Sequence, residues 1–266
     1  MNYVGKVCIL LALTATVARS RAAEEMTPEQ RGLAIATEAD RRASGYGDNT
    51  ARLRMILKNK QGQTSERKIR IRTFEATAGG TKSLCIFDEP GDVRGTILLT
   101  HTHIASEDDQ WLFLPALNRV RRIAAQNKSG SFMGSEFSYE DIATDEISKY
   151  TYTWLRDEIY DGNDCYVVER RPVDQKNSGY LRETLWIGKE HYRTWKVDYY
   201  DRKDTLLKTL VFERYELCAE KYWRAREMEM VNHQTGKSTR LIWSDFAFAT
   251  GLKDADFDRQ VLTILR

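Results

Sequence analysis

Several features that would indicate an enzyme or a string of linked domains are scarce or missing. The chain has 4 prolines among 266 residues, which leaves little room for a proline-rich linker. It has no GxSxG nucleophile motif, and the glycines of residues 130–135 stand in the wrong order for a phosphate-binding loop. Its 4 cysteines form no CxxC pair. We therefore expect one domain without a recognisable catalytic set.

The residues that are abundant indicate a folded, strand-rich protein. Hydrophobic residues make up 41% and charged residues 30% of the chain. The 6 Trp, 13 Tyr and 9 Phe favour strands and are also the residues that line apolar pockets. The formal net charge is +2, and it becomes −1 without the three basic residues of segment 1–22. This near-neutral balance gives no electrostatic argument for a nucleic-acid partner.

The N-terminal segment has the three parts of a secretory signal. Lys6 precedes a continuous apolar run at 7–17, and Ser20 and Ala22 place small residues at the −3 and −1 positions of a cut after residue 22. The alternative is a membrane anchor, but the run is shorter than the roughly 20 apolar residues that span a bilayer. We predict a signal peptide at 1–22, a periplasmic location, and one mature domain at 23–266.

The cysteines that remain after cleavage leave two alternatives open. Cys85, Cys165 and Cys218 are an odd number. Export permits one disulfide with one thiol left over, and the sequence does not say which pair would form. Three unpaired thiols fit the sequence equally well.

Apolar periodicity predicts a short helical start followed by a long series of strands. Thr27, Pro28 and Glu29 read as a helix cap, a proline in the first turn and an acid beside it. From residue 53 the period changes to two, and a hairpin is expected around the turn at 59–62. Further strand-like runs are separated by short turns, at 82–88, 96–103, 110–114, 120–124, 150–160, 165–170, 181–187, 194–200, 206–215, 222–231 and 240–247.

This spacing predicts an α+β fold built on one large curved antiparallel sheet. About 10–12 strands with short connections favour a meander that curls into a half-open barrel. A second helix is expected at 138–148, because Ser138 can cap it and acids follow. The last residues, 254–266, are compatible with either helix or strand.

A pair of histidines gives the sharpest enzyme-like signal. His101 and His103 would point to one face of a strand, and Glu107, Asp108 and Asp109 follow. That arrangement could seat a divalent metal and resembles the HxHxD loop of binuclear zinc hydrolases. However, no acid stands two residues after His103, and no third histidine follows closely. We therefore favour two polar residues on the solvent face of a strand, and we expect no metal or other cofactor.

The segment 111–123 is apolar in its first half and basic in its second. Arg119, Arg121 and Arg122 stand close together. They could contact membrane headgroups or an anionic ligand. The simpler alternative, which we favour, is that they pair with nearby acids at 108–109 and 140–141.

Two long motifs and one short motif lie in this part of the chain. They read DDQWLFLPAL at 108–117, RRI at 121–123 and GSFMGSEFSYED at 130–141. They resemble the LolA-like family of outer-membrane lipoprotein-sorting proteins, whose usual pattern is DDQWLYLP, RRI and F-MGSDF-YEDL. This chain differs modestly, with Phe113 for Tyr, Glu136 for Asp and Ile142 for Leu. The resemblance extends from the first hairpin to the last strand.

The resemblance implies a half-open barrel whose concave side is covered by helices and encloses a hydrophobic cavity for acyl chains. The cargo would be a lipid or an acylated protein, with transient membrane contact and an RND-type exporter as a possible partner. We expect apolar side chains of the motifs to line this cavity, although they could equally be plain core residues, and we expect helix 138–148 to be part of its lid. The predicted ligand-binding residues are Leu98, Trp111, Phe113, Leu114, Phe132 and Phe137.

Two other functions remain open at this stage. A non-catalytic structural subunit of an envelope complex would share the fold without an acyl-sized cavity, because fold does not fix function. A metal-dependent hydrolase would use His101 and His103. We favour the non-enzymatic carrier.

Overall fold

The computed structural model describes residues 26–77, 79–144 and 146–264. The predicted signal peptide at 1–22 lies outside these residues. The first element is helix α1 (Pro28–Ala43), which begins as its sequence predicts. The Thr27 side chain accepts the Gln30 N–H, and the Gln30 side chain accepts the Thr27 N–H, so two otherwise unpaired donors are satisfied. Within the described ranges, no helix is both long and apolar enough to cross a membrane.

A single antiparallel sheet contains all thirteen strands of the described chain. Its order is β6-β5-β4-β3-β2-β1-β13-β12-β11-β10-β9-β8-β7, so two meanders are joined by the pairing of β1 with β13. The strands are β1 (Asp48–Lys58), β2 (Thr64–Glu75), β3 (Thr81–Glu89), β4 (Ile97–His101), β5 (Asp109–Leu114), β6 (Arg119–Ile123), β7 (Tyr150–Tyr160), β8 (Asn163–Pro172), β9 (Arg182–Gly188), β10 (Thr194–Tyr200), β11 (Leu206–Cys218), β12 (Tyr222–Asn232) and β13 (Ser238–Phe248).

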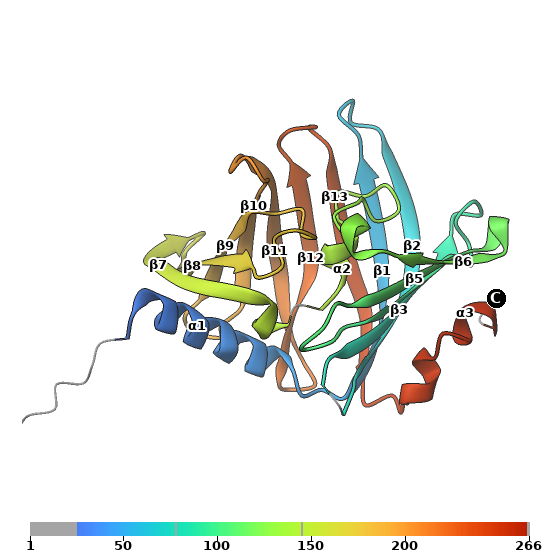
Figure 1. The fold of residues 1–266 in the computed structure, drawn as a ribbon, viewed down its shortest axis with the longest axis horizontal. Helices are drawn as coiled ribbons and strands as arrows, with labels where there is room; N and C mark the ends of the chain where they lie inside the picture. The colour runs from blue at the N-terminus through green and yellow to red at the C-terminus, as the bar shows by residue number, and fades with distance from the viewer. Residues whose placement is uncertain (1–25, 78, 145, 265–266) are drawn as a thin grey trace, which may run out of the picture.

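The sheet curves strongly but does not close, because β6 and β7 remain as its two edges (Figure 1). The predicted α+β half-open barrel is therefore confirmed. Alternation along the strands produces the two faces. In β1, Leu53 and Met55 are buried in the concave core while Arg52 and Arg54 point to solvent.

Two segments lie on the concave side of the sheet. Helix α1 runs across one half of the opening, and the chain from 129 to 142 enters the barrel in the other half (Figure 1). That inner segment ends in α2 (Tyr139–Ile142), which is much shorter than the helix expected at 138–148. Ser138 caps it as expected, but Ala143 is already extended, and only a 3-10 turn at Ile147–Lys149 follows. Short 3-10 turns also occur at Pro115–Leu117 and Ala125–Asn127.

The C-terminal segment covers the opposite, convex face. It consists of a 3-10 turn (Asp254–Phe257) and α3 (Val261–Ile264), which lie outside β3 and β5 (Figure 1). Phe257 and Leu262 are fully buried there, in a cluster with Leu84, Ile86 and Phe113. These strand residues alternate with those of the concave core, which explains why the two clusters are separate.

Candidate functional site

A cavity of about 740 Å³ opens on the concave face, between α1 and the strands β8, β9, β11 and β12. We call it the concave cavity. Its apolar part is formed by Ala36, Ala39, Ile147, Tyr152, Leu185, Ile187, Phe212 and Met228. Its mouth is formed by the β9–β10 turn at 191–194 and by residues 220–224 after β11. The volume lies within the range of about 300–1,000 Å³ that is typical of ligand sites.

Strand alternation places the apolar lining. Leu185 and Ile187 are two residues apart on β9 and therefore share a face. Phe212 of β11 stands directly opposite Met228 of β12, and both side chains are only half-buried. Cross-strand neighbours of this kind present one continuous apolar surface to the cavity.

Helix α1 covers one side of the concave cavity by a close backbone contact. A Cβ atom on Gly32 would stand 2.7 Å from the backbone N of Trp154 and 2.8 Å from the backbone of Thr153. Only glycine therefore permits this approach of α1 to β7. Ile35 and Ala36 are buried along the same contact. On the outside, the Arg31 guanidinium lies 3.7 Å from the centre of the Trp154 ring.

The mouth of the concave cavity contains two arginines, Arg193 and Arg224. Arg193 lies over the rings of Trp195 and Trp223, at 4.9 Å and 4.5 Å from their centres. Arg224 donates to the carbonyl of Ala43 at 3.0 Å, and burial lowers the pKa of its guanidinium. Inside the cavity, Arg170 is paired at 2.6 Å with Glu183, which is buried.

A second cavity, of about 550 Å³, lies beside α2. It is lined by the loop 104–108, by residues of 139–150 and by the loop 172–178. Gln110 also faces it, and the Oε1 atom of this fully buried side chain has no hydrogen-bond partner among the described residues. Its Nε2 donates to the carbonyl of Tyr139 at 2.9 Å, which fixes the orientation of the amide.

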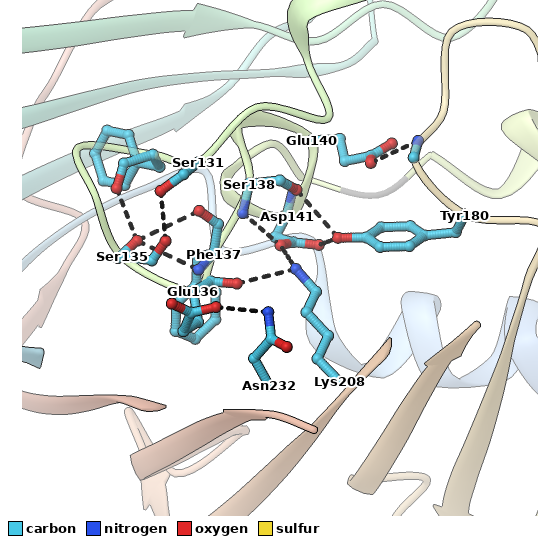
Figure 2. Close-up of polar contacts among 12 residues, drawn as sticks. Ser131, Ser135, Glu136, Phe137, Ser138, Glu140, Asp141, Tyr180, Lys208 and Asn232 are labelled. Carbon is cyan, nitrogen blue, oxygen red and sulfur yellow. Dashed lines mark hydrogen bonds and ion pairs between the residues drawn. The ribbon is translucent and has the colours of Figure 1, made fainter. Parts of the chain in front are cut away.

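A buried polar cluster fastens the inner segment to the sheet (Figure 2). Lys208 of β11 reaches the Asp141 carboxylate at 2.6 Å, and both side chains are about 5% exposed or less. The Tyr180 hydroxyl donates to the other oxygen of Asp141 at 2.8 Å, and the Ser138 N–H donates to the first at 2.6 Å. Burial raises the pKa of Tyr180 well above its usual value, so the hydroxyl remains a donor.

Two further acids of the inner segment have different surroundings. Glu136 accepts from the Asn232 side chain at 2.8 Å (Figure 2), and its N–H donates to the Thr239 hydroxyl at 2.9 Å. Glu140 accepts the Gly179 N–H at 2.9 Å and faces the second cavity. Burial, assisted by the neighbouring Asp141 charge, raises the pKa of Glu140 to about 7. Glu140 is thus the acid of this cluster that titrates near neutrality.

The residues predicted to bind ligand fall on both faces of the sheet. Leu98, Leu114, Phe132 and Phe137 belong to the concave core. Trp111 and Phe113 pack into the convex cluster beneath the C-terminal segment. None of the six lines the concave cavity or the second cavity. Their contact with a ligand remains a prediction.

The structure instead points to cavity-lining residues outside the recognised motifs. Leu185, Ile187, Phe212 and Met228 come from strands that the sequence predicts correctly. Leu185 and Ile187 share a face by their two-residue spacing on β9, whereas Phe212 and Met228 are brought together by the pairing of β11 with β12. The remaining requirement, the position of α1 over that face, depends on Gly32, which has no distinctive sequence signal.

The two histidines have different hydrogen-bond partners. His101 Nε2 is 2.8 Å from the carbonyl oxygen of Phe257, and its ring stacks edge-on against Trp111. His103 Nε2 is 3.2 Å from Asp109 Oδ2. In the part of the chain that the structure describes, no group of three His, Cys, Asp or Glu side chains could hold a metal ion.

The structure also shows the surroundings of the cysteines and of the arginines in β6. Cys85, Cys165 and Cys218 are free thiols, and the first two are buried. Arg122 pairs with Asp109 at 2.5 Å, whereas Arg119 and Arg121 are exposed on edge strand β6. The simpler expectation for the arginines therefore holds for one of the three.

Comparisons with known proteins agree with this architecture. A family model described as an uncharacterized protein matches residues 79–263. The structure of an outer membrane lipoprotein-sorting protein domain from Vibrio parahaemolyticus is 51% identical, with 88% of this chain and 99% of that chain covered and a TM-score of 0.86. A DUF1329 family protein from Desulfovibrio piger is 33% identical, with 89% and 100% covered and a TM-score of 0.84.

A more distant structure extends the likeness in fold. A LolA superfamily protein from Nitrosomonas europaea is 21% identical, with 86% of this chain and 98% of that chain covered and a TM-score of 0.71. A search of curated protein sequences gives no significant match.

Proposed function

The chain belongs to the LolA-like family of outer-membrane lipoprotein-sorting and DUF1329 proteins, and on that premise we propose that it is a non-catalytic periplasmic carrier of a lipid or an acylated protein. The observation that carries the proposal is the concave cavity, with its apolar lining and its cover by α1. The cargo's acyl chain would lie against Phe212 and Met228.

The physical basis is the transfer of an acyl chain out of water. Each buried methylene contributes about 0.8 kcal/mol, so even a partly enclosed chain gains several kcal/mol. A carrier must also release its cargo, which requires a cover that can move. Helix α1 meets this requirement better than the inner segment does, because the ion pair that joins it to β7, Arg31–Asp157, is partly exposed, whereas the Lys208–Asp141 pair of the inner segment is buried.

The proposal is tested by native mass spectrometry and lipid extraction on protein purified gently from the envelope. We expect a lipid or acylated peptide bound at near one-to-one stoichiometry, and a mature N-terminus after residue 22. An empty protein that also fails to take up a fluorescent fatty-acyl probe would overturn the carrier function.

Matched variants locate the site of uptake. Met228→Glu places a charge in the apolar part of the concave cavity and should weaken binding of the acyl probe by about tenfold or more. Val231→Glu is the control, because Val231 is exposed and lies in a groove on the opposite face of β12. Equal binding by the two variants would place the acyl chain elsewhere, for example beside Phe132 or Phe137.

The proposal includes transient membrane contact and a hand-over to a transporter of the RND type. This part rests on the family resemblance. Crosslinking in intact cells, followed by identification of the crosslinked membrane proteins, tests it. An RND transporter that is crosslinked in cells with the wild-type carrier, and not in cells without the carrier, would support the hand-over. If no RND transporter is crosslinked, the carrier acts by diffusion alone.

A further inference from the structure

We propose that the mouth of the concave cavity selects cargo with an anionic phosphate headgroup, held by the guanidinium groups of Arg193 and Arg224. This inference rests on the proposed carrier function and specifies its ligand: an amphiphile whose chain enters the apolar cavity and whose phosphate remains at the mouth.

The first observation is that the Arg224 guanidinium is partly buried and has no carboxylate partner among the described residues. Its guanidinium donates to two backbone carbonyls, those of Ala43 and Trp223, and lies 5.4 Å from the ring centres of Tyr46 and Tyr222. No carboxylate among the described residues forms an ion pair with it. Glu75 acts on it through space, but the Glu75 oxygens accept the N–H groups of residues 45 and 47. A half-buried cation without an anionic partner carries a desolvation cost, and a bound anion would offset that cost.

The second observation is the position of Arg193. Its guanidinium lies over three aromatic rings, those of Trp195, Tyr215 and Trp223, and makes no ion pair with a described residue. Stacking on these rings fixes the plane of the Arg193 guanidinium and leaves its N–H donors free to bind a phosphate. Both arginines contact Trp223: Arg193 lies 4.5 Å from the centre of its ring, and Arg224 donates to its carbonyl at 3.1 Å.

The third observation is the charge balance of the lining. The basic residues are Arg41, Arg42, Arg170, Arg193, Lys221 and Arg224, against the acids Asp40 and Glu220. Arg41 and Arg42 both pair with Glu38, and Arg170 pairs with Glu183. With Glu38 and Glu183 included, six basic residues face four acids, so a formal net charge of +2 remains, and Arg193 and Arg224 at the mouth form no ion pair with a described carboxylate. This arrangement matches a ligand that is anionic at one end and apolar along the rest.

Two amphiphiles with the same chain test the inference. Dodecyl phosphate is anionic, whereas dodecylphosphocholine carries a compensating cation on the same phosphate. Calorimetric titration of the mature protein should show about tenfold tighter binding of dodecyl phosphate, a difference of about 1.4 kcal/mol, because its phosphate meets the two guanidinium groups without an opposing choline cation. R193Q and R224Q should each remove most of that preference. R119Q on edge strand β6 makes the same charge change far from the cavity and should leave the preference intact.

The remaining outcomes separate this inference from the carrier function. Equal binding of both amphiphiles would overturn the headgroup selection and leave the carrier in place. Failure to bind either one would overturn both. Inorganic phosphate that binds as tightly as dodecyl phosphate would identify a free-phosphate site and contradict a lipid ligand. R193Q keeps the conclusion secure if R224Q does not fold, because the Arg193 side chain makes no hydrogen bond to a described residue.

Discussion

Two segments cover the same concave face, and they are held there by different interactions. The inner segment at 129–142 is fastened by the buried Lys208–Asp141 pair and its hydrogen bonds to Tyr180 and Ser138. Helix α1 is held by the packing of Ile35 and Ala36, by the backbone contact at Gly32, and by partly exposed arginine contacts. We therefore expect the inner segment to stay in its half of the barrel and α1 to separate from the sheet more easily.

The difference assigns separate roles to the two halves. The half under the inner segment buries Phe132 and Phe137 among the strands, and its cavity lies to the side, next to α2. The half under α1 keeps an apolar space. A carrier needs one rigid half to maintain the curvature of an open sheet and one half whose cover yields to cargo.

The largest expected effect comes from breaking the anchor of the inner segment. Lys208→Met removes the cation and leaves the Asp141 carboxylate buried, so the free energy of unfolding should fall by about 3–5 kcal/mol. Urea denaturation followed by tryptophan fluorescence measures it. The double variant with Asp141→Asn should recover part of the loss, since both charges are then gone.

The control for this variant is an ion pair on the surface. Lys68 and Glu89 are 2.9 Å apart, but both side chains are about half exposed. Lys68→Met should therefore change the unfolding free energy much less. Similar losses at Lys208 and Lys68 would mean that the inner segment is no more firmly anchored than a surface contact.

The next effect is a pH dependence of stability that arises from Glu140 of the inner segment. The pKa of Glu140 is about 7 in the folded protein and near 4.5 in the unfolded chain. Below pH 4.5 both states are protonated, and between 4.5 and 7 the unfolded chain loses its proton first. The folded state should therefore lose up to about 3 kcal/mol as the pH rises through this interval.

Glu140→Gln tests this assignment, because the amide oxygen can still accept the Gly179 N–H without titrating. The variant should show a flatter stability profile between pH 4.5 and 7 and a higher stability than the wild type at pH 8. Parallel profiles for the two proteins would show that Glu140 is ionised in the fold, for instance through the nearby Lys208.

The sequence predicts the sheet well because its physical cause is local. Alternation at positions such as Leu53 and Met55 and short turns between strands depend on neighbouring residues, and they determine both the strands and their antiparallel order. The α1 cap is equally local, since Thr27 and Gln30 satisfy each other. The long motif at 130–141 also identifies the family without any knowledge of packing.

The position of the site depends on packing between residues that are far apart in the sequence, and the sequence alone predicts it poorly. Trp111 and Phe113 alternate with Leu112, and which set faces inward depends on where the C-terminal segment packs. The buried cation at Lys208 reads as an ordinary surface lysine until Asp141 is placed opposite it. The cavity depends on how closely α1 approaches β7, which a single glycine decides.

Substitution of Gly32 has the smallest expected effect on stability, and it tests α1 separately from the inner segment. Gly32→Ala improves the intrinsic helix propensity of α1 by about 1 kcal/mol, but the new Cβ would lie 2.7 Å from the Trp154 backbone. Overpacking of this kind costs about 1–3 kcal/mol, and α1 can relieve it by moving away from β7. We expect faster amide hydrogen exchange in residues 28–43 and unchanged exchange in β11 and β12.

Thr37→Ala is the matched control, because Thr37 is on the exposed face of the same helix and its substitution adds nothing to the contact with β7. A displaced α1 should also speed the release of an acyl probe from the concave cavity, whereas Lys208→Met should act on global stability first. If Gly32→Ala instead unfolded the sheet together with the helix, α1 would be an integral part of the core. The contrast between a yielding cover and a fixed inner segment would then fail.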